Sequence, residues 1–288
     1  MKKALLLILI TLAAFILSGC DDDCNNILYY HDTVPTAPQG VISITGDSTV
    51  YIYWNGLYEQ DVYQYIVYRS FDPIYDYDDI GYVDPYPRPS NNIYSYTDNT
   101  VENGRTYYYA VRAVDSAGQP SELSWETVQD TPRPDGEITL YPNSLSRDYS
   151  GFNFSLPARV ADTSSIADVY MDSVGGVFYL NAGNYDYIYG EIQDVGNTFY
   201  FNQFIGYAPT EGWSELGYVE LIEGHSYVIF TYDYHYALMS VKSINPSGSV
   251  TFDWAYQTDA NNPELSPSPD GEDGRMSRPL KKAVSLNK

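Results

Sequence analysis

Two cysteines, Cys20 and Cys24, are the most reactive side chains of the sequence, and three aspartates separate them in the stretch LSGCDDDCNN. A cysteine thiolate is a nucleophile and a metal ligand. Such a residue can therefore form a disulfide, bind a metal or accept a lipid. The residues that precede Cys20 decide between these roles.

The twenty residues that end at Cys20 have the layout of a bacterial secretion signal. Lys2 and Lys3 supply the positive charge, and residues 4–17 form an apolar run that is shorter than the roughly 20 residues of a spanning helix. The tetrapeptide Leu17-Ser18-Gly19-Cys20 resembles the lipobox of bacterial lipoproteins. This resemblance implies cleavage before Cys20, a diacylglyceryl thioether on its sulfur and acylation of the new amine. Two or more acyl chains hold a protein stably on a membrane.

Lipidation of Cys20 would leave Cys24 as a single thiol. A disulfide framework and a cysteine-based zinc site are then excluded, because the sequence contains two cysteines. Cys24 is either a free thiol in a tether or a second acylation point.

The three histidines give little support for catalysis. His31 lies in the predicted tether, whereas His225 and His235 flank one predicted strand. No nucleophile motif or metal-ligand spacing surrounds them. We therefore expect no catalytic residues and no cofactor, and we keep haem binding through His225 and His235 as an alternative.

Acidic residues crowd the loop DPIYDYDDIGYVD. Asp76, Asp78 and Asp79 are its candidate calcium ligands, because calcium prefers several oxygens. The loop lacks the glycine and the closing glutamate of an EF-hand. A solvated acidic loop is the interpretation that we favour.

Tyrosines recur at alternate positions in NYDYIYGE. If this segment is one strand, Tyr185, Tyr187 and Tyr189 share a face. On a solvent-facing strand they would form a platform for sugar rings or peptides. The alternative is that they only cover a β surface.

Composition narrows the possible partners. Removal of residues 1–19 takes away two lysines and no acid, which leaves 13 basic against 38 acidic residues and a formal charge of about −25. Nucleic acid is excluded as a partner, since phosphate contacts need lysine and arginine. The 32 tyrosines favour β structure, and the sequence predicts an all-β fold.

Residues 35–130 show short alternating strands with turn signals between them. Trp54 closes the second strand, YIVYRS forms the third, and Val101 precedes Tyr107 by six residues in VENGRTY. These features resemble a fibronectin type III domain, in which the last pair marks the tyrosine corner. The resemblance implies a sandwich with Trp54 in its core, a last strand within AVRAVDSAGQPSELS, and a spacer or binding role.

The remaining residues divide into a linker, a second domain and a tail. We expect a linker at 131–137, an antiparallel sandwich or barrel at 138–258 with a hairpin of YVIFTY and YALMSVKSI, and a disordered tail at 259–288. The second domain resembles an uncharacterised C-terminal module of bacterial secreted lipoproteins, and more faintly the haem-binding surface lipoproteins. Residues 1–19 are the signal, and residues 20–34 are an acidic tether.

The sequence as a whole predicts a lipid-anchored, non-enzymatic protein of the bacterial cell envelope that binds a protein or a glycan. The alternatives are a carrier of haem or calcium and an accessory protein of a secreted polysaccharide-degrading system. Acidic residues directly after the lipidated cysteine resemble an inner-membrane retention signal in enteric bacteria and a surface export signal in a Bacteroidetes-like group. We favour the outer membrane or the cell surface.

Overall fold

The computed structural model describes residues 33–185, 188–198 and 206–266. Cys20, Cys24 and Tyr187 lie outside these ranges, as do the predicted signal and nearly all of the tether. Contacts divide the chain into residues 1–33 and 34–288, and every strand described below belongs to the second part. Within the described ranges, no helix is both long enough and apolar enough to cross a membrane.

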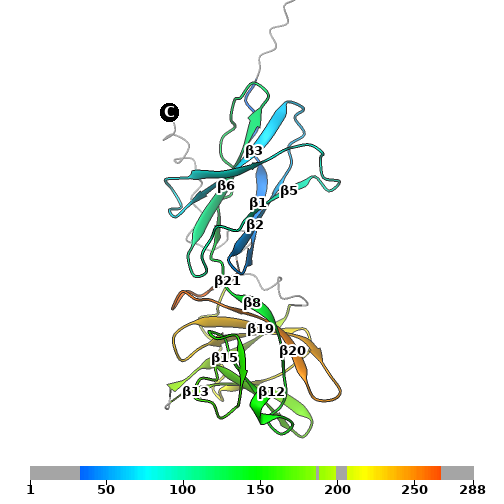
Figure 1. The fold of residues 1–288 in the computed structure, drawn as a ribbon, viewed down its shortest axis with the longest axis vertical. Helices are drawn as coiled ribbons and strands as arrows, with labels where there is room; N and C mark the ends of the chain where they lie inside the picture. Colours follow the sequence, from blue (N-terminus) through cyan, green and yellow to red (C-terminus); the bar gives the residue numbers. More distant parts are fainter. Residues whose placement is uncertain (1–32, 186–187, 199–205, 267–288) are drawn as a thin grey trace, which may run out of the picture. The chain divides into compact units, whose positions relative to one another are not determined.

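The first sandwich confirms the predicted fibronectin type III fold, with one sheet of three strands and one of four (Figure 1). The first sheet has the order β1-β2-β5, with bounds β1 (Gln39–Gly46), β2 (Thr49–Asn55) and β5 (Ile93–Asp98). The second has the order β4-β3-β6-β7, with bounds β4 (Asp78–Val83), β3 (Val62–Ser70), β6 (Tyr107–Asp115) and β7 (Val128–Asp130).

An aromatic cluster fills the space between these two sheets. Trp54 is 1% exposed and meets Tyr65 edge to face, with ring centroids 5.6 Å apart. The ring centroids of Tyr65 and Tyr94 are 4.9 Å apart. The Tyr65 hydroxyl accepts a hydrogen bond from the Leu57 amide. The predicted place of Trp54 in the core is confirmed.

The last strand of the first sandwich lies later than predicted. Residues 120–124 run beside β6 without forming a strand, and β7 begins at Val128. The Ser121 and Ser124 hydroxyls accept hydrogen bonds from the Ala113 and Val111 amides, in place of main-chain carbonyls. Serine hydroxyls compete with the sheet ladder in this way, so regular pairing starts only after them.

The predicted linker at 131–137 is too long. Only residues 131–134 lie between β7 and β8 (Asp135–Leu140), whose first three residues pair with β20 (Val250–Tyr256). Pro132 and Pro134 lack the amide proton that a strand needs, whereas Asp135, Gly136 and Glu137 keep theirs. The stretch without strand pairing between β7 and β8 is therefore shorter than the composition of residues 131–137 suggests.

The second domain is a sandwich of two five-stranded sheets rather than a barrel. One sheet has the order β10-β9-β11-β12-β17, with bounds β10 (Ala158–Val160), β9 (Gly151–Asn153), β11 (Val169–Val174), β12 (Val177–Ala182) and β17 (Tyr218–Glu220). The other has the order β15-β18-β19-β20-β8, with bounds β15 (Glu191–Asn197), β18 (His225–Phe230) and β19 (Tyr236–Ile244). Strands β18 and β19 form the predicted hairpin, and Figure 1 shows β19, β20 and β8 side by side.

Smaller elements complete the second sandwich, namely β13 (Asn184–Tyr185), β14 (Ile188–Tyr189), β16 (Gly206–Tyr207), β21 (Glu264–Ser266) and the 3-10 helix η1 (Arg147–Tyr149). Its core draws on both sheets and includes Phe152, Met171, Leu180, Ile229 and Phe252. Asp168 is a buried carboxyl in this sandwich, and it accepts a hydrogen bond of 2.8 Å from the Phe154 amide.

The two sandwiches share a tyrosine corner. The Tyr107 hydroxyl accepts a hydrogen bond from the Glu102 amide at 2.9 Å, and the Tyr227 hydroxyl accepts one from the Ile222 amide at 2.8 Å. A glycine of positive φ lies three residues before each tyrosine, namely Gly104 with a φ of 78° and Gly224 with a φ of 83°. Glycine adopts this conformation without steric cost. The heptapeptides VENGRTY and LIEGHSY therefore make the same turn.

Strand order extends this likeness beyond the corner. Strands β11, β12 and β17 are neighbours in the same order as β1, β2 and β5, and β15, β18 and β19 follow the order of β3, β6 and β7. The second sandwich adds β9 and β10 beyond β11, and β20 and β8 beyond β19. Its central strands thus repeat the pairing of the first sandwich.

The predicted tail at 259–288 begins too early. Residues 264–266 form β21, which pairs with β16, and Leu265 is 1% exposed. The buried Glu264 carboxylate accepts hydrogen bonds from the Gln129 side-chain Nε2 at 2.6 Å and from the Thr131 hydroxyl at 3.0 Å. These contacts fix residues 264–266 in the fold, although their composition alone is typical of a disordered tail. Residues 267–288 lie outside the described ranges.

Candidate binding surfaces

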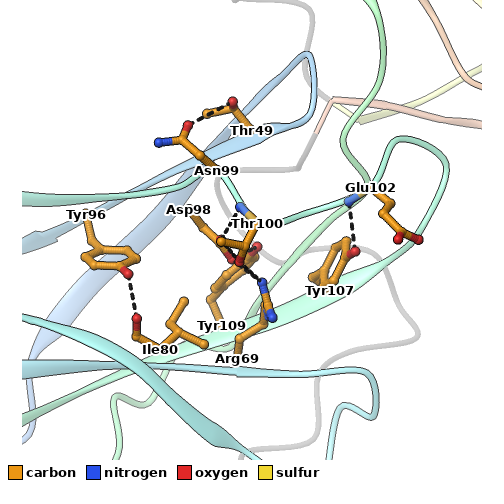
Figure 2. A network of polar contacts seen from close by, with 10 residues as sticks. All are labelled: Thr49, Arg69, Ile80, Tyr96, Asp98, Asn99, Thr100, Glu102, Tyr107 and Tyr109. Carbon is orange, nitrogen blue, oxygen red and sulfur yellow. Dashed lines mark hydrogen bonds and ion pairs between the residues drawn. The ribbon is translucent and has the colours of Figure 1, made fainter.

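A buried polar network fixes one end of the first sandwich (Figure 2). The Asp98 carboxylate is 2% exposed and accepts hydrogen bonds from Arg69 at 2.7 Å, Tyr109 at 3.1 Å and the Thr100 amide at 2.9 Å. Burial by itself raises the pKa of Asp98, but the hydrogen bonds from Thr100 and Arg69 outweigh it, so the pKa lies below its ordinary value.

The same network joins both sheets and the tyrosine corner. Asp98 ends β5, Arg69 belongs to β3, and the Arg69 guanidinium also lies 5.2 Å from the centre of the Tyr107 ring. The Tyr96 hydroxyl of β5 donates to the Ile80 carbonyl of β4 at 2.6 Å (Figure 2). Each of these side chains hydrogen-bonds to another part of the first sandwich. The network therefore supports the fold of the sandwich.

The outer side of the β1-β2-β5 sheet is apolar. Ile42 pairs with Tyr53 and Ile44 pairs with Tyr51 across β1 and β2, and Ile42, Ile44 and Tyr51 are 36%, 37% and 40% exposed. On β5, Ser95 and Thr97 lie opposite the two tyrosines. We call this surface the Ile-Tyr face, and it consists of Ile42, Ile44, Tyr51, Tyr53, Ser95 and Thr97.

The Ile-Tyr face carries no charged side chain, in a chain whose formal net charge is −23. Its large residues alternate with the buried Val41, Ser43, Val50 and Ile52. The alternation arises because side chains of a strand point to opposite sides in turn. Large contiguous patches of exposed apolar surface are frequent at interaction sites, so the Ile-Tyr face is a candidate binding surface.

The outer side of the other sheet differs in chemistry. Its β6 strand carries Arg112, whose guanidinium lies 5.5 Å from the centre of the Tyr68 ring. Tyr82 on β4 is 66% exposed. This side therefore offers tyrosines together with a cation, and it provides a matched comparison for the Ile-Tyr face.

The predicted tyrosine platform is not a single strand. Tyr185 ends β13 and Tyr189 ends β14, and these strands pair antiparallel through Tyr185 with Ile188 and Asn184 with Tyr189. The Gly190 amide donates to the Gly183 carbonyl at 3.1 Å and extends the pairing. The chain thus reverses between Tyr185 and Tyr189, so the alternation assumed for one strand does not apply. Tyr187 lies outside the described residues.

The structure separates the two candidate haem ligands. His225 begins β18, whereas the main chain of His235 pairs with Thr231 just past the other end of β18. Six residue steps of a strand amount to roughly 20 Å, so the two imidazoles cannot reach one iron. Each has a carboxylate neighbour instead, Asp194 at 3.0 Å from His225 and Asp233 at 3.4 Å from His235. The structure thus does not bring together the two histidines of the haem alternative.

The acidic loop before β4 uses carboxylates to form turns. Asp72 accepts hydrogen bonds from the Ile74 and Tyr75 amides at 2.8 and 3.1 Å, and Asp79 accepts one from the Gly81 amide at 3.0 Å. Asp76 has a φ of 58°, in the left-handed region. In the described part of the chain, no three His, Cys, Asp or Glu side chains gather in a way that could hold a metal ion. Asp76, Asp78 and Asp79 are therefore not gathered into such a group.

Comparisons with known proteins give partial likenesses. No protein-family profile and no curated protein matches the chain. Among solved structures, a β-1,2-glucanase from Parabacteroides distasonis is similar over 34% of this chain and 12% of its own, at 33% identity and a TM-score of 0.28.

Two further structures are similar over comparable shares of the chain. A Fn3-like protein from Clostridium thermocellum matches 35% of this chain and 96% of its own, at 25% identity and a TM-score of 0.28. The pectate lyase PelI from Erwinia chrysanthemi matches 34% of this chain and 28% of its own, at 20% identity and a TM-score of 0.28. This chain thus spans only a small part of the glucanase and of the lyase.

Proposed function

We propose that the chain is a lipid-anchored, non-catalytic binding protein of the bacterial cell envelope, and that its Ile-Tyr face binds a protein partner. The observation that carries this proposal is the row of Ile42, Ile44, Tyr51 and Tyr53 on the outer side of β1 and β2. The signal, the lipobox and the acidic tether support the anchored location.

A protein fits this surface better than a glycan does. The centres of protein interfaces are poor in charge and rich in tyrosine, which is the composition of the Ile-Tyr face. It is the side of a sheet rather than a cleft, and its polar groups are the hydroxyls of Tyr51, Tyr53, Ser95 and Thr97. A glycan needs many directed hydrogen bonds, which this surface supplies less well than the stacking and apolar contact that suit another protein.

Photocrosslinking in intact cells tests the proposal. A photoreactive phenylalanine replaces Tyr53 in one strain and Tyr82 in another, since Tyr82 is exposed on the opposite sheet. We expect a discrete protein adduct from the Tyr53 position and none from Tyr82. The adduct partner, once purified, should bind a Tyr51→Ser, Tyr53→Ser double variant at least about tenfold more weakly, because interface tyrosines are frequent hot spots.

Three outcomes would contradict the proposal. One is equal crosslinking at both positions, and another is an unchanged affinity of the double variant for the purified partner. The third is retention of the chain on envelope polysaccharide that the double variant abolishes, which would assign the face to a glycan. A Tyr82→Ser variant controls for the loss of an exposed tyrosine.

A further inference from the structure

A second surface, on the second sandwich, has a different shape and chemistry. It is a hollow of about 490 Å³ lined by Tyr141, Leu145, Ser146, Tyr149, Arg159 and Ser247. Small-molecule sites commonly have volumes of roughly 300 to 1,000 Å³. The lining comes from three separate segments, namely residues 141–149 after β8, strand β10, and the turn between β19 and β20.

Local hydrogen bonds hold the first of these segments. The Tyr141 amide donates to the Tyr149 carbonyl at 3.2 Å, and the Tyr149 amide donates to the Ser146 carbonyl at 3.2 Å. The neighbouring Arg147 forms an ion pair of 3.1 Å with Asp162. Residues 141–149 therefore form a closed loop that presents Tyr141 and Tyr149 together.

The other two segments are equally well defined. Arg159 pairs with Phe152 in the ladder between β10 and β9, and Phe152 is 1% exposed. The Ser247 amide and hydroxyl both donate to the Asn245 side chain, at 3.0 and 2.9 Å. The walls of the hollow are therefore built by strand pairing and by a tight turn.

The lining combines an exposed aromatic ring with an arginine. Tyr149 is 50% exposed, and the Arg159 guanidinium lies 5.7 Å from the centre of its ring. Within the described residues Arg159 has no ion-pair partner, and the lining contains no carboxylate. A guanidinium pairs with a carboxylate through two parallel hydrogen bonds.

We propose that this hollow binds a short acidic saccharide. The C–H groups on one side of a pyranose ring pack against an aromatic ring, as Tyr149 and Tyr141 allow. Arg159 would pair with the carboxylate of a uronic acid, and the Ser146 and Ser247 hydroxyls would meet the hydroxyls of the sugar. The site is independent of the Ile-Tyr face, so failure of either proposal leaves the other intact.

Calorimetric titration of the mature chain carrying Cys20→Ser tests this site with two probes of equal length, tetragalacturonate and uncharged cellotetraose. We expect the acidic probe to bind and the neutral one to bind at least about tenfold more weakly, since hydrogen bonds to an ionised carboxylate are stronger than those between neutral groups. Tyr149→Ala should weaken tetragalacturonate binding at least tenfold. Arg159→Gln should remove the preference for the acidic probe.

The pair Arg88 and Tyr58 on the first sandwich provides the matched control. Its guanidinium lies 5.3 Å from the ring centre, and Tyr58 is 81% exposed. Tyr58→Ala should leave the titration unchanged, and circular dichroism should show that all variants are folded. The proposal is overturned if the parent chain binds neither probe at millimolar concentration, if both probes bind equally, or if Tyr58→Ala rather than Tyr149→Ala removes binding.

Discussion

Asp168 makes the stability of the second sandwich depend on pH. It is 4% exposed, and burial, together with the nearby Asp233, raises the pKa of its carboxyl to about 7, although the Phe154 amide lowers it. The folded chain thus keeps this proton up to about pH 7, whereas the unfolded chain loses it near pH 4. Its contribution to stability is greatest in acid, and it declines as the pH rises from about 4 to about 7.

Replacement of Asp168 by asparagine should remove this dependence. The new amide side chain would keep an oxygen for the Phe154 amide but would not ionise. We expect urea unfolding at pH 5 and pH 8 to show a fall in unfolding free energy for the parent chain that is larger, by roughly 2 to 3 kcal/mol, than for Asp168→Asn. Asp130 and Glu264 also have raised pKa values, and the difference between the two chains isolates Asp168.

The exposed Asp78 supplies the control for this measurement. Asp78→Asn should keep the pH dependence of the parent chain. Equal dependence in the parent and in Asp168→Asn would contradict the assignment.

The structural role of a single residue could be predicted from the sequence only where the residue belongs to a known motif. Trp54 and Tyr107 could be predicted because their spacing fits a known sandwich. Asp98 and Asp168 could not, because their burial depends on strands that are distant in the sequence. The Ile-Tyr face was missed for a related reason, since the exposed side of an alternating strand becomes known only when its partner sheet is known.

At the scale of the element, the tyrosine corners should differ in strength. The Tyr227 hydroxyl accepts from the Ile222 amide and donates to the Glu220 carbonyl at 2.9 Å. Removal of a buried hydrogen-bond partner costs roughly 1 to 3 kcal/mol. We expect Tyr227→Phe to lower the unfolding free energy by about 2 kcal/mol and Tyr107→Phe, which loses the bond from Glu102, by about 1 kcal/mol.

Urea titrations measure both losses, and the exposed Tyr82 is the control. Tyr82→Phe should change stability by less than about 0.5 kcal/mol. If the two corner variants match Tyr82→Phe, the hydroxyl bonds of the corners do not stabilise the sandwiches.

Most strands could be predicted from alternation, but their ends could not. Alternation reports which side chains are buried, and this is a local pattern. The position of β7 depends instead on the hydroxyls of Ser121 and Ser124, and the inclusion of β21 depends on the contacts of Glu264 with Gln129 and Thr131. The contacts of Glu264 join residues that are 133 and 135 positions apart in the sequence, and the serine hydroxyls act only once residues 120–124 lie beside β6.

At the scale of the whole molecule, the lipid and the charge act together. Without residues 1–19 the chain has a formal net charge of about −25, and an anionic membrane surface repels it. The lipid proposed on Cys20 must therefore provide the membrane anchor. We expect Cys20→Ser to release the chain from the membrane fraction and to abolish incorporation of labelled palmitate.

Cys24 provides the control, because its replacement removes a thiol close to Cys20 without removing the proposed lipid attachment point. Cys24→Ser should leave both fractionation and labelling unchanged. Palmitate incorporation that survives Cys20→Ser would refute the anchor.

The place of the Ile-Tyr face on β1 and β2 has a mechanical consequence. The first strand that the structure describes after the proposed anchor is β1, and six residue pairs join it to β2, from Gln39 with Asn55 to Gly46 with Thr49. A pulling force between the membrane and a partner on this face would load β1, its pairing with β2 and the contacts that hold β1 to the rest of the first sandwich, such as the hydrogen bond from the Thr45 hydroxyl to Asp130. The second sandwich follows later in the chain and lies outside this direct path, so we expect its hollow to keep its shape under such a force.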